Sequence, residues 1–268
     1  MVRQKSFYIA MVIMLLLYFW MTNAAGLQNN TPFASFYADK NTLVDFLYYF
    51  PKSAFYAVAV LVFLSLFFCE EYASGFVKNI YPSIHRKELL LLERFVFSFI
   101  TAFIYWIAII VMVAVENLWQ QDSFATFNIL QFIGYSLMQM LILTVIASSL
   151  NLLIHATGSK VLAILVSVGY GSMTIFMLHA GIMSLLNVDY TDYILYAISG
   201  QLPVEWDALF YSRAAMVAIT SAILYNVGSY ILLRKKDLPN SIKMICGISI
   251  NIAQPTVVTA VAILLASR

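Results

Sequence analysis

Residues 95–115, FVFSFITAFIYWIAIIVMVAV, form an apolar run without a charged side chain. A bilayer with a hydrocarbon core about 30 Å thick is crossed by a helix of about 20 apolar residues. The run therefore predicts a transmembrane helix. Five further apolar segments have a suitable length: residues 7–25, 53–69, 129–150, 161–186 and 211–233. The sequence thus predicts an all-α polytopic membrane protein with six transmembrane helices.

The composition supports this fold class. Of the 268 residues, 62% are hydrophobic and 10% are charged, whereas about 25% are charged in soluble proteins. A soluble fold of this size could not cover so much apolar surface with polar side chains. The composition excludes a soluble enzyme, a disordered protein and a nucleic-acid-binding protein, and it makes the lipid bilayer the chain's environment.

The two ends of the chain leave alternatives open. Residues 244–266 are a candidate seventh span, but polar residues and Pro255 near the middle also fit a re-entrant or surface helix. Residues 1–25 could be a cleaved signal peptide, although consecutive aromatic residues in this run are typical of an interfacial anchor. We divide the chain into a six-span domain, residues 1–238, and a hydrophobic C-terminal extension, residues 239–268.

The loop charges predict the orientation. With the N-terminus in the cytoplasm, the long outer loops are residues 26–52 and 187–210, and most acidic residues lie outside. Cytoplasmic segments are richer in Lys and Arg than outer ones. The predicted cytoplasmic segments hold eleven of the fifteen Lys and Arg residues: Arg3, Lys5, Lys78, Arg86, Lys87, Arg94, Lys160, Arg234, Lys235, Lys236 and Lys243.

Motifs for catalysis are missing. Gly-Ser-Lys at residues 158–160 is only a fragment of a phosphate-binding loop, and we interpret it as a turn. His85, His155 and His179 are scattered and form no His-Glu-x-x-His motif. No carboxylate lies in the middle of a span, where ion-coupled carriers usually place one. We expect no catalytic residue, no metal site and no cofactor in this chain.

The fourth predicted span, residues 129–150, contains uncharged polar side chains at regular spacing. Gln131, Tyr135 and Gln139 recur every four residues, so they share one face of a helix. Amides and hydroxyls at such positions commonly bond neighbouring helices. The functional alternative is a subunit interface or the wall of a transport pathway.

The segment after the second span is the most specific part of the sequence. Residues 69–80 read CEEYASGFVKNI, and Pro82 follows. Glu70 and Glu71 suit the first turn of a helix, where negative charge is favourable. We expect two short amphipathic helices, the second from Ile84 to about Arg94, which leads into the third span. Together they form a cytoplasmic segment, residues 70–94.

The pattern Glu-Glu-Tyr-x-Ser-Gly-x-x-Lys-Asn in this segment resembles the motif of ABC-2 type permeases, the membrane subunits of ATP-binding-cassette exporters. The six-span order and the basic residues 234–236 after the sixth span also resemble that family. The resemblance implies an ABC-2 type arrangement and a coupling helix that docks on a separate ATPase. It places ATPase-coupling residues at Glu70, Glu71, Tyr72, Ser74, Gly75, Phe76, Lys78 and Asn79.

The resemblance also implies partners and a location. These are two cytoplasmic ATPase subunits, which bind ATP and Mg, and a second permease subunit, identical or a sister chain. The location is the cytoplasmic (inner) membrane of a bacterium. Small permeases of this layout resemble exporters of amphipathic peptides, including those of bacteriocin immunity.

Two features depart from the family pattern. Only about six residues precede the first span, and residues 239–268 exceed the usual ending. Two alternatives share the composition. One is a non-catalytic scaffold or immunity protein that sequesters a peptide, which needs no coupling helix. The other is a membrane-embedded enzyme, for which we find no clustered catalytic set.

Overall fold

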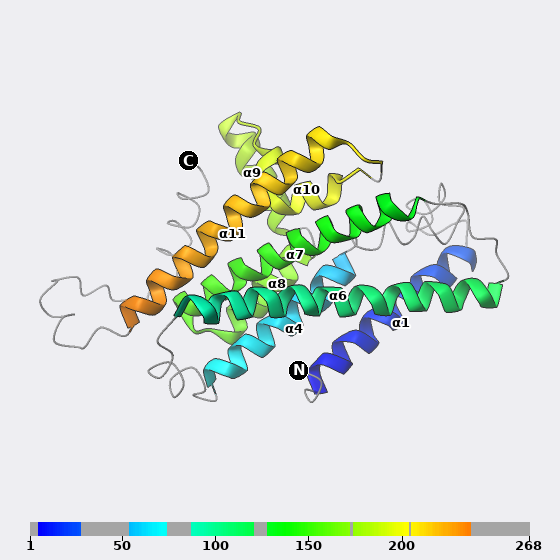
Figure 1. Ribbon diagram of the computed structural model, residues 1–268, viewed down its shortest axis with the longest axis horizontal. Helices are drawn as coiled ribbons and strands as arrows, with labels where there is room; N and C mark the ends of the chain where they lie inside the picture. Colours follow the sequence, from blue (N-terminus) through cyan, green and yellow to red (C-terminus); the bar gives the residue numbers. More distant parts are fainter. Residues whose placement is uncertain are drawn as a thin grey trace, which may run out of the picture.

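A computed structural model describes residues 5–27, 54–73, 87–120, 128–171, 174–203 and 205–236. All regular secondary structure in these ranges is helical, as the composition predicts (Figure 1). The helices are α1 (Lys5–Leu27), α4 (Ala54–Ala73), α6 (Lys87–Gln120), α7 (Ile129–Thr157), α8 (Lys160–Gly171), α9 (Thr174–Leu186), the 3₁₀ helix η2 (Thr191–Tyr193), α10 (Leu195–Gln201) and α11 (Ala208–Lys236).

Each predicted span coincides with a helix or with a pair of helices. Among the described residues, α6, α7 and α11 are long and apolar enough to cross a membrane. This supports a membrane protein, and crossing by the other helices stays a prediction. Residues 239–268 lie outside the described part, so the candidate seventh span also stays a prediction.

The prediction of one long fifth span is wrong, because α8 and α9 are separate helices. A Cβ atom on Gly169 would lie 3.1 Å from the side chain of Ile175. Residues six apart on one straight helix are separated by about 9 Å along its axis. The close approach therefore shows that α9 does not continue α8.

The core of the bundle is centred on α4, which packs against α8, α1 and α7. Ser65 of α4 and Ser167 of α8 share a hydrogen bond of 2.6 Å, and the Ser167 hydroxyl also lies 3.3 Å from the carbonyl of Leu61. Small residues permit this closeness. Gly171 meets Val58 so tightly that a Cβ atom there would lie 2.9 Å from the Val58 backbone nitrogen.

Two buried tyrosines connect α6 to its neighbours. The hydroxyl of Tyr56 on α4 donates to the carbonyl of Ala102, at 2.9 Å. The hydroxyl of Tyr105 on α6 donates to the carbonyl of Phe7 on α1, also at 2.9 Å. A buried hydroxyl is costly unless it is hydrogen-bonded, so these contacts fix how α1, α4 and α6 are placed.

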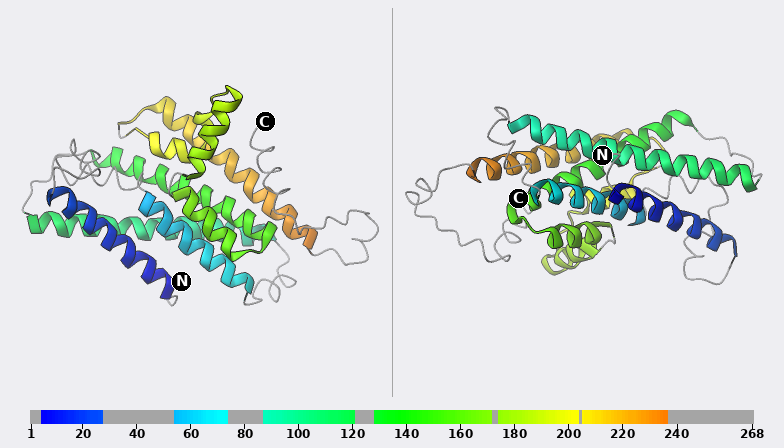
Figure 2. Two further views of the ribbon diagram at one scale, coloured as in Figure 1. Left: turned by 180° about the vertical axis from the view of Figure 1, so that it is seen from behind. Right: turned by 90° about the horizontal axis from the view of Figure 1, so that it is seen from below.

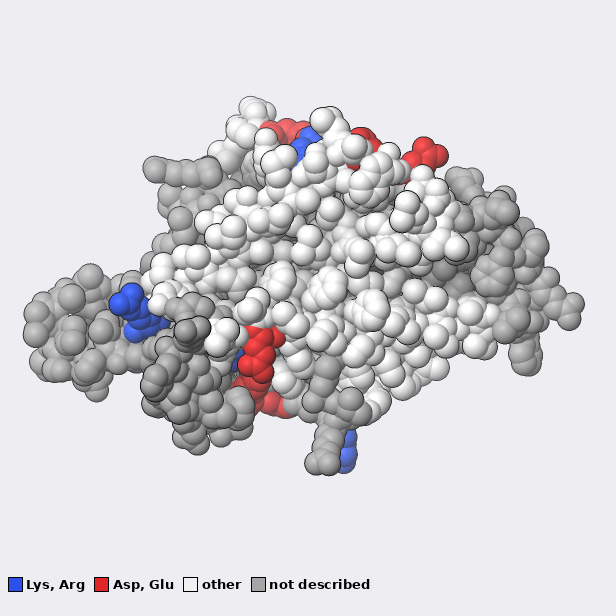
Figure 3. All heavy atoms as spheres, viewed as in Figure 1, with Lys and Arg blue, Asp and Glu red and all other residues white. Residues whose placement is uncertain are grey.

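Charged side chains lie at both ends of the bundle. The ends of α4, α7 and α11 and the start of α6 point the same way in both sets of views (Figures 1 and 2). Figure 3 shows Lys and Arg spheres where α11 ends, Asp and Glu spheres along the upper edge, and a further group of Asp and Glu spheres on the lower side. Because acidic residues lie on both sides, which end faces the cytoplasm stays a prediction.

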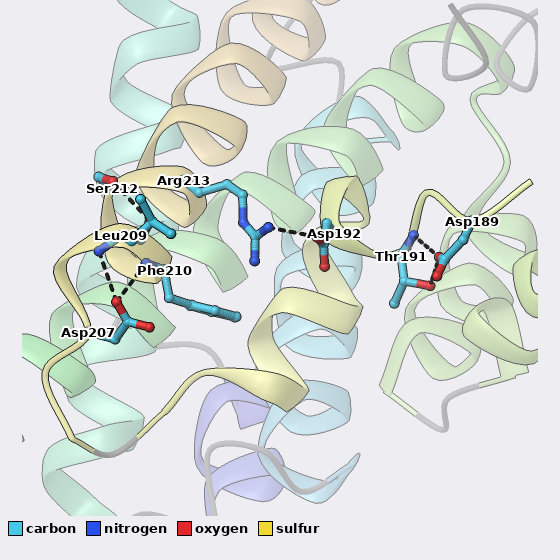
Figure 4. A network of polar contacts seen from close by, with 8 residues as sticks. All are labelled: Asp189, Thr191, Asp192, Asp207, Leu209, Phe210, Ser212 and Arg213. Carbon is cyan, nitrogen blue, oxygen red and sulfur yellow. Dashed lines mark hydrogen bonds and ion pairs between the residues drawn. The ribbon is translucent and has the colours of Figure 1, made fainter.

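The predicted outer loop 187–210 contains η2 and α10, and α10 is buried at Leu195, Tyr196, Ala197 and Ile198. Short polar contacts hold the segment against α11 (Figure 4). The carboxylate of Asp207 accepts from the backbone N–H groups of Leu209 and Phe210, at 3.0 and 3.3 Å, and so caps α11. Figure 4 also shows Arg213 paired with Asp192, at 2.6 Å.

Gly171→Ala tests the α4–α8 contact. The added methyl group meets the Val58 backbone, which cannot move without shifting α4. We expect the free energy of unfolding to fall by about 1–3 kcal/mol, the usual cost of overpacking. The measurement is thermal unfolding of the purified protein in detergent.

Gly181→Ala is the matched control, because a Cβ atom at this helical position of α9 has nothing within 4 Å. It should leave the unfolding midpoint unchanged or raise it, since alanine favours a helix over glycine. Equal effects of the two substitutions would contradict the tight α4–α8 contact.

Candidate functional site

The structure places only part of the predicted coupling segment. Glu70, Glu71 and Tyr72 belong to α4. The remaining predicted coupling residues lie outside the described residues: Ser74, Gly75, Phe76, Lys78 and Asn79. The docking helix itself therefore stays a prediction.

The prediction that Glu70 and Glu71 open a new helix is wrong, because both lie near the end of α4, Ala54–Ala73. No proline or glycine interrupts this stretch, so the apolar helix continues into the glutamates. Negative charge is unfavourable at the C-terminal end of a helix. Glu71 therefore requires a cation nearby.

The prediction of a separate second helix, residues 84–94, also fails for its described part. Residues 87–94 are the first turns of α6, which continues without a break to Gln120. Leucines and charged residues with good helix propensity join the predicted amphipathic helix to the span. Arg94 is consequently carried by a helix that enters the apolar bundle.

Arg94 supplies the cation that Glu71 requires. Its Nη2 atom lies 3.0 Å from Oε2 of Glu71. Its Nη1 atom donates to Oδ1 of Asn151, at 2.6 Å, and lies 3.1 Å from Nε2 of His155. The guanidinium carbon also stands 5.3 Å from the ring centre of Phe68, a cation–π distance. We call Glu71, Arg94, Asn151 and His155 the Arg94 cluster.

The Arg94 cluster is a buried polar site. Arg94 is 6% exposed, Asn151 3% and His155 0%, and only Glu71, at 24%, retains substantial access to solvent. An arginine carries only donors, so Nε2 of His155 must accept and its proton must be on Nδ1. His155 is therefore neutral, and Glu71 is the anion that balances Arg94.

The carboxyl group of Glu71 is not in an ordinary environment. Burial raises its pKa above the usual 4.5, and the neighbouring Arg94 offsets this only in part. The folded state therefore binds the Glu71 proton more tightly than the unfolded chain does. The stability contribution of Glu71 is complete below about pH 4.5 and is lost as the pH rises through the raised pKa.

Sequence reasoning missed this cluster as a unit. By sequence, Arg94 falls among the charges of the predicted cytoplasmic segments, and His155 among scattered histidines. One signal was present: Asn151 and His155 are four residues apart, so they share a face of α7 in an otherwise apolar stretch. The spacing of Asn151 and His155 does not indicate which helix carries their hydrogen-bonding partner, Arg94.

The predicted polar face of α7 is confirmed for Tyr135 and Gln139, which are both buried. The Gln139 amide donates to the Tyr135 hydroxyl, at 3.3 Å, and to the carbonyl of Ser199, at 2.8 Å. Its Oε1 atom accepts from the Ser199 hydroxyl, at 2.6 Å. Gln131 lies half-buried in the first turn of the helix. These contacts attach α10 to α7, and a pathway role for this face stays a prediction.

A small cavity adjoins Gln139. Tyr56, Tyr196, Ser199 and Gly200 also line it, and its volume is about 10 Å³. A polar cavity of that size is about the smallest that holds a single water molecule. It is much too small for an amphipathic substrate, so the structure shows no open route here.

Arg94→Met tests the buried cluster. The substitution leaves Glu71 without its cation and deprives Asn151 of a donor. Removing one partner of a buried pair costs about 3–5 kcal/mol, and we expect the lower end because Glu71 is partly exposed. Thermal unfolding in detergent measures the loss.

Two further variants sharpen this test. The double substitution Glu71→Leu with Arg94→Met should recover much of the loss, because neither charge is then stranded. Arg213→Met breaks the exposed pair with Asp192 and should cost less than about 1 kcal/mol. Strictly additive effects of the Glu71 and Arg94 substitutions would show that the two residues are not coupled.

Gln139→Leu tests the attachment of α10. Ser199 then loses a donor and an acceptor in a half-buried position. We expect a loss of about 1–3 kcal/mol from the groups left unpaired, seen as a lower unfolding midpoint. Gln131→Leu, on the same face but outside this contact, is the control. A larger effect at Gln131 would contradict the assignment.

No protein-family model, no curated protein and no solved structure matches this chain. What the Arg94 cluster does is therefore argued from its own geometry.

Proposed function

We propose that this chain is the membrane-spanning permease subunit of an ATP-binding-cassette exporter that moves an amphipathic peptide or a similar amphiphile. A separate ATPase drives the transport. The observation that carries the proposal is the Arg94 cluster. It joins the two borders of segment 70–94, because Glu71 lies at the end of α4 and Arg94 at the start of α6.

The geometry suits the transmission of force. A partner that pushes on segment 70–94 acts on α4 and α6 together, because an ion pair buried on the Arg94 side connects them. Asn151 and His155 extend the connection to α7. α4 in turn packs along α8 through Ser65 and Ser167. One movement at the segment can therefore shift four helices as a body.

The partners follow from the same proposal. Two ATPase subunits bind ATP and Mg and dock on residues 70–80. A second permease subunit, identical or a sister chain, completes the pathway in the cytoplasmic membrane of a bacterium. The most apolar window of α11 is only 17% buried and that of α6 is 33% buried. These faces leave room for lipid.

The substrate class has less support. It rests on the layout shared with small peptide exporters and on the methionine-rich spans. Met140 is buried in the core, whereas Met177 is exposed on α9. Met177 is therefore the methionine of α9 that could contribute to an adaptable surface, whereas Met183 on the same helix is buried.

A charge exchange tests the coupling. Glu71→Arg places two cations side by side and should abolish substrate-stimulated ATPase activity of the purified complex. The double exchange Glu71→Arg with Arg94→Glu restores opposite charges and should recover part of that activity. Glu205→Arg is the control, because Glu205 is exposed and lies outside segment 70–94.

Co-purification from native membranes tests the partner. We expect an ATPase at equal stoichiometry, lost when residues 74–80 are replaced by a Gly-Ser linker. Purification of the chain alone under the mildest detergent would contradict the exporter and would favour the peptide-sequestering scaffold. Full transport by the Glu71→Arg variant would not contradict the ATPase partner, but it would contradict a coupling role for the Arg94 cluster.

A further inference from the structure

A groove lies between α6 and α11, close to the start of α6 and in the second half of α11. Figures 1 and 2 show these two parts of the helices at the same end of the bundle. Leu92 and Phe95 form one wall, and Ile223, Val227 and Tyr230 form the other. Its volume is about 450 Å³, within the range of about 300–1,000 Å³ for small-molecule sites. The function proposed above does not use this groove.

The walls are suited to hydrocarbon. The polar side chain Asn226 also lines the groove, but its amide donates to the carbonyl of Ala222, at 2.8 Å. Leu92, Ile223 and Val227 are about half exposed. Both helices are candidate membrane spans with mostly uncovered surfaces. The groove therefore opens toward the bilayer, where acyl chains are the available apolar ligands.

A cation continues the same face of α11. Val227, Tyr230 and Arg234 follow one another at intervals of three and four residues, so they lie along one stripe of the helix. Arg234 is exposed and makes no ion pair with a described residue. Lys235 and Lys236 complete α11 directly after it. We call these three consecutive basic residues of the sequence, 234–236, the basic cluster; Arg234 is the one whose side chain the structure describes.

We propose that this groove binds an anionic phospholipid, with one acyl chain between α6 and α11 and the phosphate at Arg234. A guanidinium binds phosphate oxygens through two parallel hydrogen bonds, and basic pockets between membrane helices attract anionic headgroups. Glu93 follows Leu92 on α6 and is exposed. The headgroup is therefore placed on the α11 side.

Charge disfavours two other occupants. In a two-fold dimer the same patch meets itself, so a second copy seated here would bring two basic clusters together on one side of the membrane. The hydrophobic extension is also a poor match, because residues 239–268 contain no Asp or Glu to pair with Arg234, and the last acidic residue, Asp237, precedes them. An anionic lipid fills the groove and also neutralises the cluster.

The test uses the purified full-length chain and two probes, phosphatidylglycerol and phosphatidylcholine with identical acyl chains. Native mass spectrometry counts bound lipid, and thermal unfolding in detergent measures stabilisation. We expect tighter binding of phosphatidylglycerol. Arg234→Gln should weaken that binding about fivefold, as expected for one basic residue at an anionic surface, and should leave phosphatidylcholine unchanged.

Two further variants distinguish binding of the acyl chain in the groove from attraction of the headgroup by surface charge. Val227→Trp fills the groove and should weaken binding of both lipids, while the unfolding midpoint without lipid shows that the variant is folded. Lys160→Gln removes an exposed charge at the start of α8, away from the groove, and should change neither affinity.

Four results would overturn the proposal. One is equal binding of the two lipids by the unaltered chain. Another is an effect of Lys160→Gln as large as that of Arg234→Gln, which would indicate general surface charge. A third is loss of a dimer in Val227→Trp, which would assign the groove to a second copy. The fourth is lipid binding that appears only after residues 239–268 are removed.

Discussion

The described part of this protein is shaped by one constraint: polar groups inside an apolar bundle are costly unless they find partners within the chain. Five hydroxyls on α6, α7 and α8 find one locally by donating to the carbonyl group four residues earlier: Ser98, Thr101, Thr144, Ser148 and Ser167. The buried Ser136 hydroxyl and the Trp106 indole N–H are exceptions, without a hydrogen-bond partner among the described residues. Longer side chains find hydrogen-bond partners on other helices, as the hydroxyls of Tyr56 and Tyr105 do. Arg94 is the extreme case, because a buried charge needs both an anion and neutral acceptors. The positions of α4, α6 and α7 follow from satisfying it.

Features that depend on one segment could be predicted from the sequence, whereas features that depend on contacts between distant segments could not. Apolar runs located the helices, because run length and the absence of charge are properties of one segment. The shared face of Tyr135 and Gln139 followed from helical spacing alone. The break between α8 and α9 could not be predicted, because an apolar run has the same composition whether its helix is straight or interrupted. The burial of α10 was missed for another reason: Gln139, which holds it, lies 60 residues away.

The Arg94 cluster could not be predicted, because a basic residue beside an apolar run can either face the membrane surface or be buried in the bundle. A basic residue at the border of an apolar run is typical of the membrane surface, and most such residues here fit that interpretation. Among the Lys and Arg residues whose side chains the structure describes, Arg94 alone is buried, and nothing in its sequence neighbours distinguishes it from Arg234. Both ends of the bundle are joined by polar contacts, but only the Arg94 side has a buried ion pair among the described residues: the other end combines the buried amide of Gln139 with the solvent-exposed pair of Arg213 and Asp192.

The division of the fifth segment has a consequence for how the chain enters a membrane. α8 has 12 residues and α9 has 13, so each is about 18–20 Å long and neither spans a core about 30 Å thick. Neither helix can insert stably as an independent unit. α8 has its hydrogen-bonding partner, Ser65, on a helix synthesised about one hundred residues earlier. The placement of α8 therefore depends on a helix that the ribosome completes much earlier, and α4 must be present before α8 can form this contact.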